Sequence, residues 1–144
     1  MIKKCDYMDI PNVTRLALLL WPNHSYEELE EEISNYILSN DSAIFIKCKE
    51  DVIIAFAECS LRTDYVEGTN SSHVGYLEGI FVREDFRGIG IAKDLVLKCE
   101  SWAKQKGCVE FASNCELGNI DSLEFHKKIG FKEVQRIICF SKKI

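Results

Sequence analysis

The sequence predicts an α+β fold with a central mixed, mostly antiparallel sheet flanked by helices, in the order β-α-α-β-β-β-α-β-α-β. Apolar residues recur at helical spacing in four segments, and short runs rich in β-branched and aromatic residues lie between and around them. One such run, ending at Val82, passes through a glycine loop directly into a long amphipathic segment. That succession is typical of a strand followed by a crossover helix and a parallel neighbouring strand.

The composition favours one globular domain over residues 1–144, with 47% apolar and 28% charged residues. A net charge of −5 argues against nucleic-acid binding and is compatible with a cationic ligand. No apolar run approaches the roughly 20 residues of a membrane span, and we expect neither a membrane segment nor a signal peptide. The seven cysteines are odd in number and form no Cys-x-x-Cys pair, which predicts reduced thiols in a cytoplasmic protein and no metal site.

The first elements are a short strand over residues 2–5 and two helices. The apolar spacing predicts a helix over 11–20, which ends there because Pro22 disfavours helical geometry in the residue before it. A Ser-x-x-Glu capping box opens a second helix over 25–39. The acidic face of this second helix is interpreted as a solvated surface.

The middle of the chain changes to strand character. Residues 43–48 and 52–61 are predicted to form an antiparallel hairpin, because a short charged turn separates two apolar runs. A polar connection over 63–73 then leads into a strand that covers 77–82.

The last part predicts a helix to about residue 106, a strand over 109–115 and a helix over 120–129. Glycines end both helices. Residues 131–135 and 136–141 are predicted as terminal strands after the last helix.

The segment Arg87-Gly-Ile-Gly-Ile-Ala92 carries the first functional signal. A glycine loop that opens a helix leaves backbone N–H groups without partners, next to the positive end of the helix dipole. Gly88 and Gly90 permit positive φ and close approach of a ligand to the backbone. The segment therefore predicts a site for an anion such as a phosphate or pyrophosphate.

Three motifs follow one another in the second half of the chain. They are Arg87-x-x-Gly90-x-Ala92 after a strand, Asn119, and His126 four residues before Gly130-Phe131. Together they resemble the GNAT family of acyl-CoA-dependent N-acetyltransferases, in which the first motif is a pyrophosphate loop. The order of elements fits this family across nearly the whole chain.

Further matching segments are spread from residue 20 to residue 143. They are Leu20-Trp-Pro22 with His24, Tyr65-Val-x-Gly68-Thr, Val74-Gly-Tyr-Leu-Glu-Gly-Ile-Phe-Val82, Trp102-Ala-Lys-Gln105, Glu110-Phe-Ala-Ser113 and Phe140-Ser-Lys-Lys143. They resemble the small bacterial aminoglycoside 6′-N-acetyltransferases.

The resemblance implies acetyl-CoA as the donor and no metal. Its pyrophosphate would lie on the N–H groups of 88–93, and its pantetheine arm would add to the strand edge at 80–82 as an extra strand. A backbone N–H there would polarise the thioester carbonyl. Asn119 would hydrogen-bond the cofactor's amide arm or, alternatively, cap the helix that follows it. The expected cofactor-binding residues are Ile80, Phe81, Val82, Arg87, Gly88, Ile89, Gly90, Ile91, Ala92, Lys93 and Asn119.

Two residues are candidates for catalysis. Glu78 is a carboxylate inside an apolar strand, where it would bind the substrate ammonium and take its proton directly or through water. Alternatively it is an outward-facing side chain on a half-exposed strand. His126 occupies the position where many GNAT enzymes have a tyrosine that protonates the departing thiolate. Its alternative role is structural, because a histidine complements the dipole at a helix C-terminus.

The same resemblance implies an acceptor site with aromatic platforms and polar contacts. Trp21, His24 and Tyr65 have core or dimer packing as the alternative. Asn114 and Gln135 are amides where close relatives carry acidic residues, which puts affinity for polycationic drugs in question. The expected substrate-binding residues are Trp21, His24, Tyr65, Glu78, Asn114 and Gln135.

The leading functional hypothesis is transfer of acetyl from acetyl-CoA to the 6′-amine of aminoglycosides, by direct attack in a ternary complex. The first alternative is a GNAT enzyme for another small amine, such as a polyamine, amino sugar or peptide amine. The second is a CoA-binding domain without turnover. The family also implies a homodimer, and the apolar terminal strand around 136–140 has an edge that needs covering.

Overall fold

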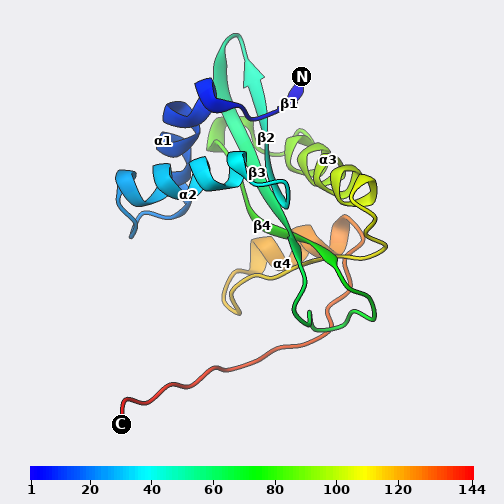
Figure 1. Cartoon of the computed structure of the whole chain (residues 1–144). Helices are drawn as coiled ribbons and strands as arrows, with labels where there is room; N and C mark the ends of the chain where they lie inside the picture. The colour runs from blue at the N-terminus through cyan, green and yellow to red at the C-terminus, as the bar shows by residue number, and fades with distance from the viewer.

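The computed structural model describes residues 1–144 (Figure 1). Its strands and helices, in chain order, are β1 (Ile2–Lys4), α1 (Ile10–Leu20), α2 (Tyr26–Leu38), β2 (Ser42–Lys49), β3 (Val52–Arg62), β4 (Val74–Val82), α3 (Ile91–Gln105), β5 (Phe111–Ser113) and α4 (Ile120–Lys128). Short 3₁₀ turns lie before α1 and between β4 and α3. The predicted order is thus found from the first strand to the last helix.

The strands form one five-stranded sheet in the order β1-β2-β3-β4-β5. Neighbours are antiparallel except β4 and β5, which are parallel and are joined through α3 as predicted. The β2–β3 hairpin turns at Glu50 and Asp51, both with φ of 50°. Two consecutive positive φ values fit the right-handed twist of the strands they join.

The two faces of the sheet are covered by different helices (Figure 1). On one face α1 and α2 pack against side chains such as Ile44 and Phe56. On the other face α3 packs against Ala57 and Cys59, which point the opposite way because successive side chains of a strand alternate. Trp102 of α3 belongs to this second core.

The pairing between β4 and its neighbours is incomplete at one end. β5 pairs only with residues 75–77 of β4, so the edge of 78–82 that faces away from β3 has no strand beside it. On the other side, Glu58 pairs with Gly79 and Cys59 with Leu77, which leaves Glu78 as the extra residue of a bulge. A bulge turns a side chain away from its regular direction.

The two predicted terminal strands, 131–135 and 136–141, are wrong for the single chain. From Phe131 to Ile144 the structure has neither helix nor strand, and this segment leaves the body as an extended tail (Figure 1). Val134 still contacts the protein, at Gly68. Ile138 and Phe140 are 74% and 91% exposed. No strand of the same chain lies beside this segment, so its backbone lacks the hydrogen-bond partners that a strand needs.

Two further findings concern the whole chain. None of the helices has the length and apolar character that crossing a bilayer requires. No group of three or more His, Cys, Asp or Glu side chains is arranged to hold a metal ion.

Candidate functional site

The glycine loop has the open form that anion binding requires. Gly88 and Gly90 have φ of 82° and 91°, and a Cβ added at either position would meet no atom within 4 Å. The backbone N–H groups of 88–93 make no hydrogen bond within the chain, and α3 begins without a side-chain cap. These donors stand at the N-terminus of a 15-residue helix, where the dipole favours negative charge.

Arg87 ties this loop to the end of β4. Its Nε donates to the carbonyl oxygen of Val82 at 2.7 Å, and its guanidinium lies 5.4 Å from the centroid of the Phe81 ring. The side chain therefore holds the strand end and the loop together, which places the free N–H groups next to the unpaired edge of 78–82.

The unpaired edge of β4 begins where β5 ends. Ser113 is the last residue of β5, and its Oγ lies 3.4 Å from the carbonyl oxygen of Leu77, the last β4 residue paired with β5. Beyond this point the backbone of 78–82 lies free for an extended ligand with amide groups to pair with it.

His126 and Ser113 form a hydrogen-bonded pair beside this opening. The imidazole Nδ1 lies 2.7 Å from the carbonyl oxygen of Ser122, which can only accept, so Nδ1 carries the proton. In the neutral ring Nε2 is then an acceptor, and the Ser113 hydroxyl donates to it at 2.8 Å. A proton can pass between His126 Nε2, on α4, and the Ser113 hydroxyl, at the end of β5.

The Gly130-Phe131 pair positions this histidine. Gly130 has φ of 102°, which turns the chain sharply after α4. The Phe131 ring centroid then lies 5.1 Å from that of His126 and 6.2 Å from that of Phe111. Aromatic packing at these distances stabilises one ring orientation.

Asn119 has the capping role that the sequence left open. Its Oδ1 accepts a hydrogen bond from the backbone N–H of Ser122 at 3.1 Å, at the start of α4. Its role toward a cofactor stays a prediction.

Glu78 is held by three donors and is not a free, outward-facing side chain. Arg62 donates from Nε and Nη2 to the two carboxylate oxygens, each at 2.8 Å, and Ser60 donates from Oγ at 2.8 Å. The hydrogen bond to Glu78 raises the pKa of Arg62 above its usual value. A bidentate pair of this kind fixes the direction of the carboxylate.

The contacts continue from Arg62 to Asn114. The guanidinium carbon lies 3.5 Å from the centroid of the Tyr76 ring, and Asn114 donates from Nδ2 to the Tyr76 hydroxyl at 2.8 Å. Burial raises the pKa of Tyr76, so its hydroxyl stays neutral. Glu78 and Asn114, both expected at the acceptor, are thus linked through Arg62 and Tyr76, which sequence reasoning did not single out.

Trp21 lies over Gly79, directly beside Glu78 in the strand. A Cβ added at Gly79 would come within 2.6 Å of the Trp21 ring, so only glycine allows this contact. The ring also packs at 6.1 Å, centroid to centroid, from Phe56. Trp21 is therefore partly buried against the core and at the same time lies beside the candidate site.

The three remaining predicted acceptor residues lie at the surface. His24 is exposed, and its Nδ1 is 3.4 Å from Oε2 of Glu28. Tyr65 is 75% exposed. Gln135 is exposed in the C-terminal tail. Their part in an acceptor site stays a prediction.

Glu58 is a buried carboxyl group that sequence reasoning missed. It is only 2% exposed, and burial raises its pKa to about 8. The signal was present in the sequence, because Glu58 interrupts the apolar run Ile53 to Cys59 just as Glu78 interrupts its own strand.

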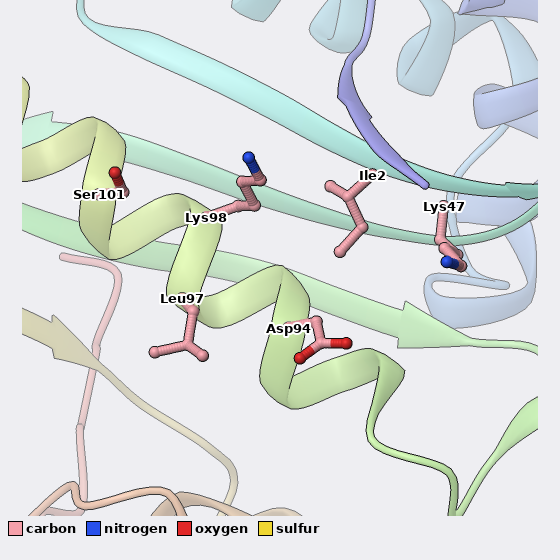
Figure 2. A pocket seen from close by; sticks show the side chains of 6 residues that line it. All are labelled: Ile2, Lys47, Asp94, Leu97, Lys98 and Ser101. Atoms are coloured by element: carbon pink, nitrogen blue, oxygen red, sulfur yellow. The ribbon is translucent and has the colours of Figure 1, made fainter.

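A separate groove of about 450 Å³ lies away from these residues (Figure 2). In Figure 2, side chains of α3, Asp94 and Lys98, lie across from Ile2 and Lys47 of the β1–β2 edge. This edge is the opposite end of the sheet from β4 and β5. We assign the groove no part in the site.

The sequence matches known proteins over nearly its whole length. The model of the acetyltransferase (GNAT) family matches residues 10–131. An aminoglycoside N(6′)-acetyltransferase type 1 of Serratia marcescens is 37% identical over 143 residues, which is 99% of this chain and 98% of that protein. The protein of the same name from Acinetobacter genomosp. 13 is 41% identical, over 90% of this chain and 88% of that protein.

Solved structures agree with the sequence matches. AAC(6′)-Iy in complex with the bisubstrate analogue CoA-S-monomethyl-acetylneamine has a TM-score of 0.95 at 35% identity, and the match covers 100% of this chain and 98% of that one. The aminoglycoside 6′-N-acetyltransferase AAC(6′)-Ig of Acinetobacter haemolyticus, without ligand, has a TM-score of 0.93 at 35% identity, over 100% and 99% of the two chains.

Proposed function

This chain belongs to the acetyltransferase (GNAT) family, and we propose that it transfers the acetyl group of acetyl-CoA to the 6′-amine of aminoglycoside antibiotics. The amine attacks the bound thioester directly, in a ternary complex. Acetylation removes a positive charge from the drug, and the enzyme thereby gives resistance. The relatives' activity and the CoA-containing neighbour structure support the assignment.

The observation that carries the proposal is the continuity of residues 78–93. A strand edge without a partner runs into a loop whose N–H groups are also free. An elongated ligand that has amide groups at one end and a pyrophosphate beyond them fits this order, and acetyl-CoA is such a ligand. Its pantetheine arm pairs with 80–82, and its pyrophosphate lies on 88–93.

The acceptor binds on the side of β4 where Trp21 and Glu78 lie. Glu78 attracts the substrate ammonium, and Arg62 and Ser60 keep the carboxylate in one orientation. The face of Trp21 stacks against a sugar ring. Asn114, tied to the Tyr76 hydroxyl, contributes a polar contact without a charge.

The leaving thiolate receives its proton through Ser113 and His126. When the ring is protonated, Nε2 donates to the Ser113 oxygen, and the hydroxyl of Ser113 faces the start of the open edge. Because a thiolate leaves readily, this pair adds modestly to the rate.

Release of CoA thiol tests the reaction. We expect turnover with kanamycin and tobramycin, and mass spectrometry of the product locates one acetyl group at the 6′-amine. Turnover with spermidine or glucosamine but with no aminoglycoside would contradict the proposed acceptor. Absence of thiol release with every amine would contradict an enzymatic role.

We also propose that the enzyme is a homodimer assembled through its C-terminal tail. The support is the apolar side chains that the tail exposes, with Ile137, Ile138 and Phe140 between 59% and 91% exposed. A second copy would cover them. Sedimentation should show a dimer for the full chain and a monomer after deletion of 132–144. A full-length monomer at micromolar concentration would contradict the proposal.

Residues 1–144 act together as one catalytic domain, and the proposed location is the cytoplasm. All seven cysteines are free thiols in the structure, including exposed Cys115 and Cys139. Free thiols persist in the reducing conditions of that compartment.

A further inference from the structure

Building on the acceptor site proposed above, we propose that Glu58 is a second acidic group of that site, which carries a proton while the site is empty and releases it when a cationic amine binds.

Glu58 and Glu78 lie on neighbouring strands and share one face of the sheet. Glu58 pairs with Gly79, the residue next to Glu78. Its side chain points to the face of Phe56, which lies in the core under α1 and α2, because residues two apart in a strand point the same way. The hydroxyl of Ser60, two residues further on, donates a hydrogen bond to Glu78.

The Glu58 carboxyl group has no hydrogen-bond partner in the protein. Its residue is 2% exposed, yet no fully enclosed side-chain oxygen in the chain lacks a partner. The two Glu58 oxygens therefore each keep a small solvent-accessible area. A buried carboxyl group without a donor is an unfavourable arrangement that an incoming donor relieves.

The neighbouring charges act against ionisation of Glu58. Burial raises its pKa most, and the carboxylates of Glu32 on α2 and Glu78 on β4 raise it further. Tyr36 also faces it from α2, and burial raises the pKa of that phenol so that it stays neutral. No cation is among the groups that shift the pKa of Glu58. Arg62, four residues further along β3, donates both of its side-chain hydrogen bonds to Glu78. No positive charge of the protein is thus left for Glu58.

An ammonium group of the substrate supplies the missing charge. The binding step is protonated Glu58 plus a substrate ammonium giving a carboxylate–ammonium pair and one proton released to solvent. A polycationic acceptor therefore neutralises two carboxylates of the site, of which only Glu78 is already compensated by the protein. A group with a raised pKa is suited to this exchange near neutral pH.

The same group makes the free protein less stable as the pH rises. The pKa of Glu58 is about 8 in the folded chain and near its ordinary value of 4.5 in the unfolded chain, so the folded state binds more protons between these limits. The contribution of Glu58 to stability is therefore present at low pH and is lost as the pH rises toward 8. Glu58→Gln should flatten this part of the melting temperature's pH dependence.

Calorimetric titration of the CoA-bound enzyme with tobramycin at pH 7 tests the proposal. Two buffers of different ionisation enthalpy give the number of protons exchanged. We expect the wild type to release close to one proton more per site than Glu58→Gln. In infrared difference spectra, the wild type should lose a protonated carboxyl band on tobramycin binding, and this band should be missing from Glu58→Gln.

Glu31→Gln is the matched control, because Glu31 is an exposed acid of α2 that is not among the charges acting on Glu58. It should release as many protons as the wild type. Equal proton numbers in the wild type and Glu58→Gln would overturn the role of Glu58 and leave the acetyl transfer untouched. A wild type that binds spermidine with proton release but no aminoglycoside would instead overturn the proposed drug acceptor.

Discussion

The donor half of the site is built from backbone, whereas the acceptor half is built from side chains. Residues 80–93 offer a strand edge and a loop whose N–H groups are free, and these are contiguous in the sequence. The acceptor half combines Trp21 after α1, Glu58 and Arg62 on β3, Glu78 on β4 and Asn114 after β5. One half depends on local conformation, and the other depends on how distant segments pack.

The two halves are therefore sensitive to different kinds of substitution. Backbone donors remain when side chains vary, so the donor half depends mainly on the glycines that keep the loop open. The acceptor half depends on a charge balance in which Arg62 pairs with Glu78, whereas the charged neighbours of Glu58 are the carboxylates of Glu32 and Glu78. Removing one of these charges changes the electrostatic interactions of the remaining ones.

Replacing Glu78 by Gln should have the largest effect on the reaction. It should impair the acceptor half without changing the donor half. The change removes a charge-assisted acceptor worth about 1.5–3 kcal/mol, which corresponds to a loss in kcat/KM of about 10- to 100-fold. The Kd for acetyl-CoA should not change, as equilibrium titration can show. A parallel loss of acetyl-CoA affinity would mean that the halves are not independent.

Gly90→Ala should damage the donor half alone. An alanine at φ of 91° is strained by about 1–2 kcal/mol, and a loop that shifts to relieve this strain misplaces its N–H groups. We expect the Kd for acetyl-CoA to rise about tenfold, because a strain energy of this size corresponds to such a change in affinity.

Gly107→Ala is the matched control for that change. Gly107 follows the other end of α3, also has φ of 91°, and also has no atom within 4 Å of an added Cβ. Both variants should melt at a lower temperature, but only Gly90→Ala should bind acetyl-CoA more weakly. Equal binding by the two variants would remove the glycine loop from the site.

His126→Gln should reduce kcat by about three- to tenfold, less than a typical general acid contributes, because the thiolate leaves readily. If Ser113 passes the same proton, the double variant with Ser113→Ala should be no slower than His126→Gln alone. Additive losses in single-turnover measurements would show that the two residues act separately.

Asn114→Asp should have the smallest effect and should act only on the acceptor. It adds a charge at an exposed position, where a pair is worth up to about 1 kcal/mol, so KM for tobramycin should fall by up to about fivefold. The new carboxylate can accept from the Tyr76 hydroxyl in place of the present bond. Gln105→Glu, at the far end of α3, adds the same charge and should leave KM unchanged.

Much of the fold followed from the sequence because its signals are local. The capping box at Ser25 and Glu28 is present in the structure, with hydrogen bonds in both directions. The parallel pairing of β4 and β5 was likewise predicted from a strand, a glycine loop and a helix. The tail failed because strand propensity around Ile137 does not by itself supply a neighbouring edge for its hydrogen bonds.

The donor half follows from local sequence, since an open glycine loop at a helix start requires only consecutive residues. The acceptor half depends instead on tertiary packing. That packing pairs Glu78 with Arg62, 16 residues away, and encloses Glu58 without a donor. In the sequence, Glu58 and Glu78 are similar, because each interrupts an apolar strand. They differ in the folded protein because packing gives each carboxyl group different charged neighbours and a different degree of exposure to water.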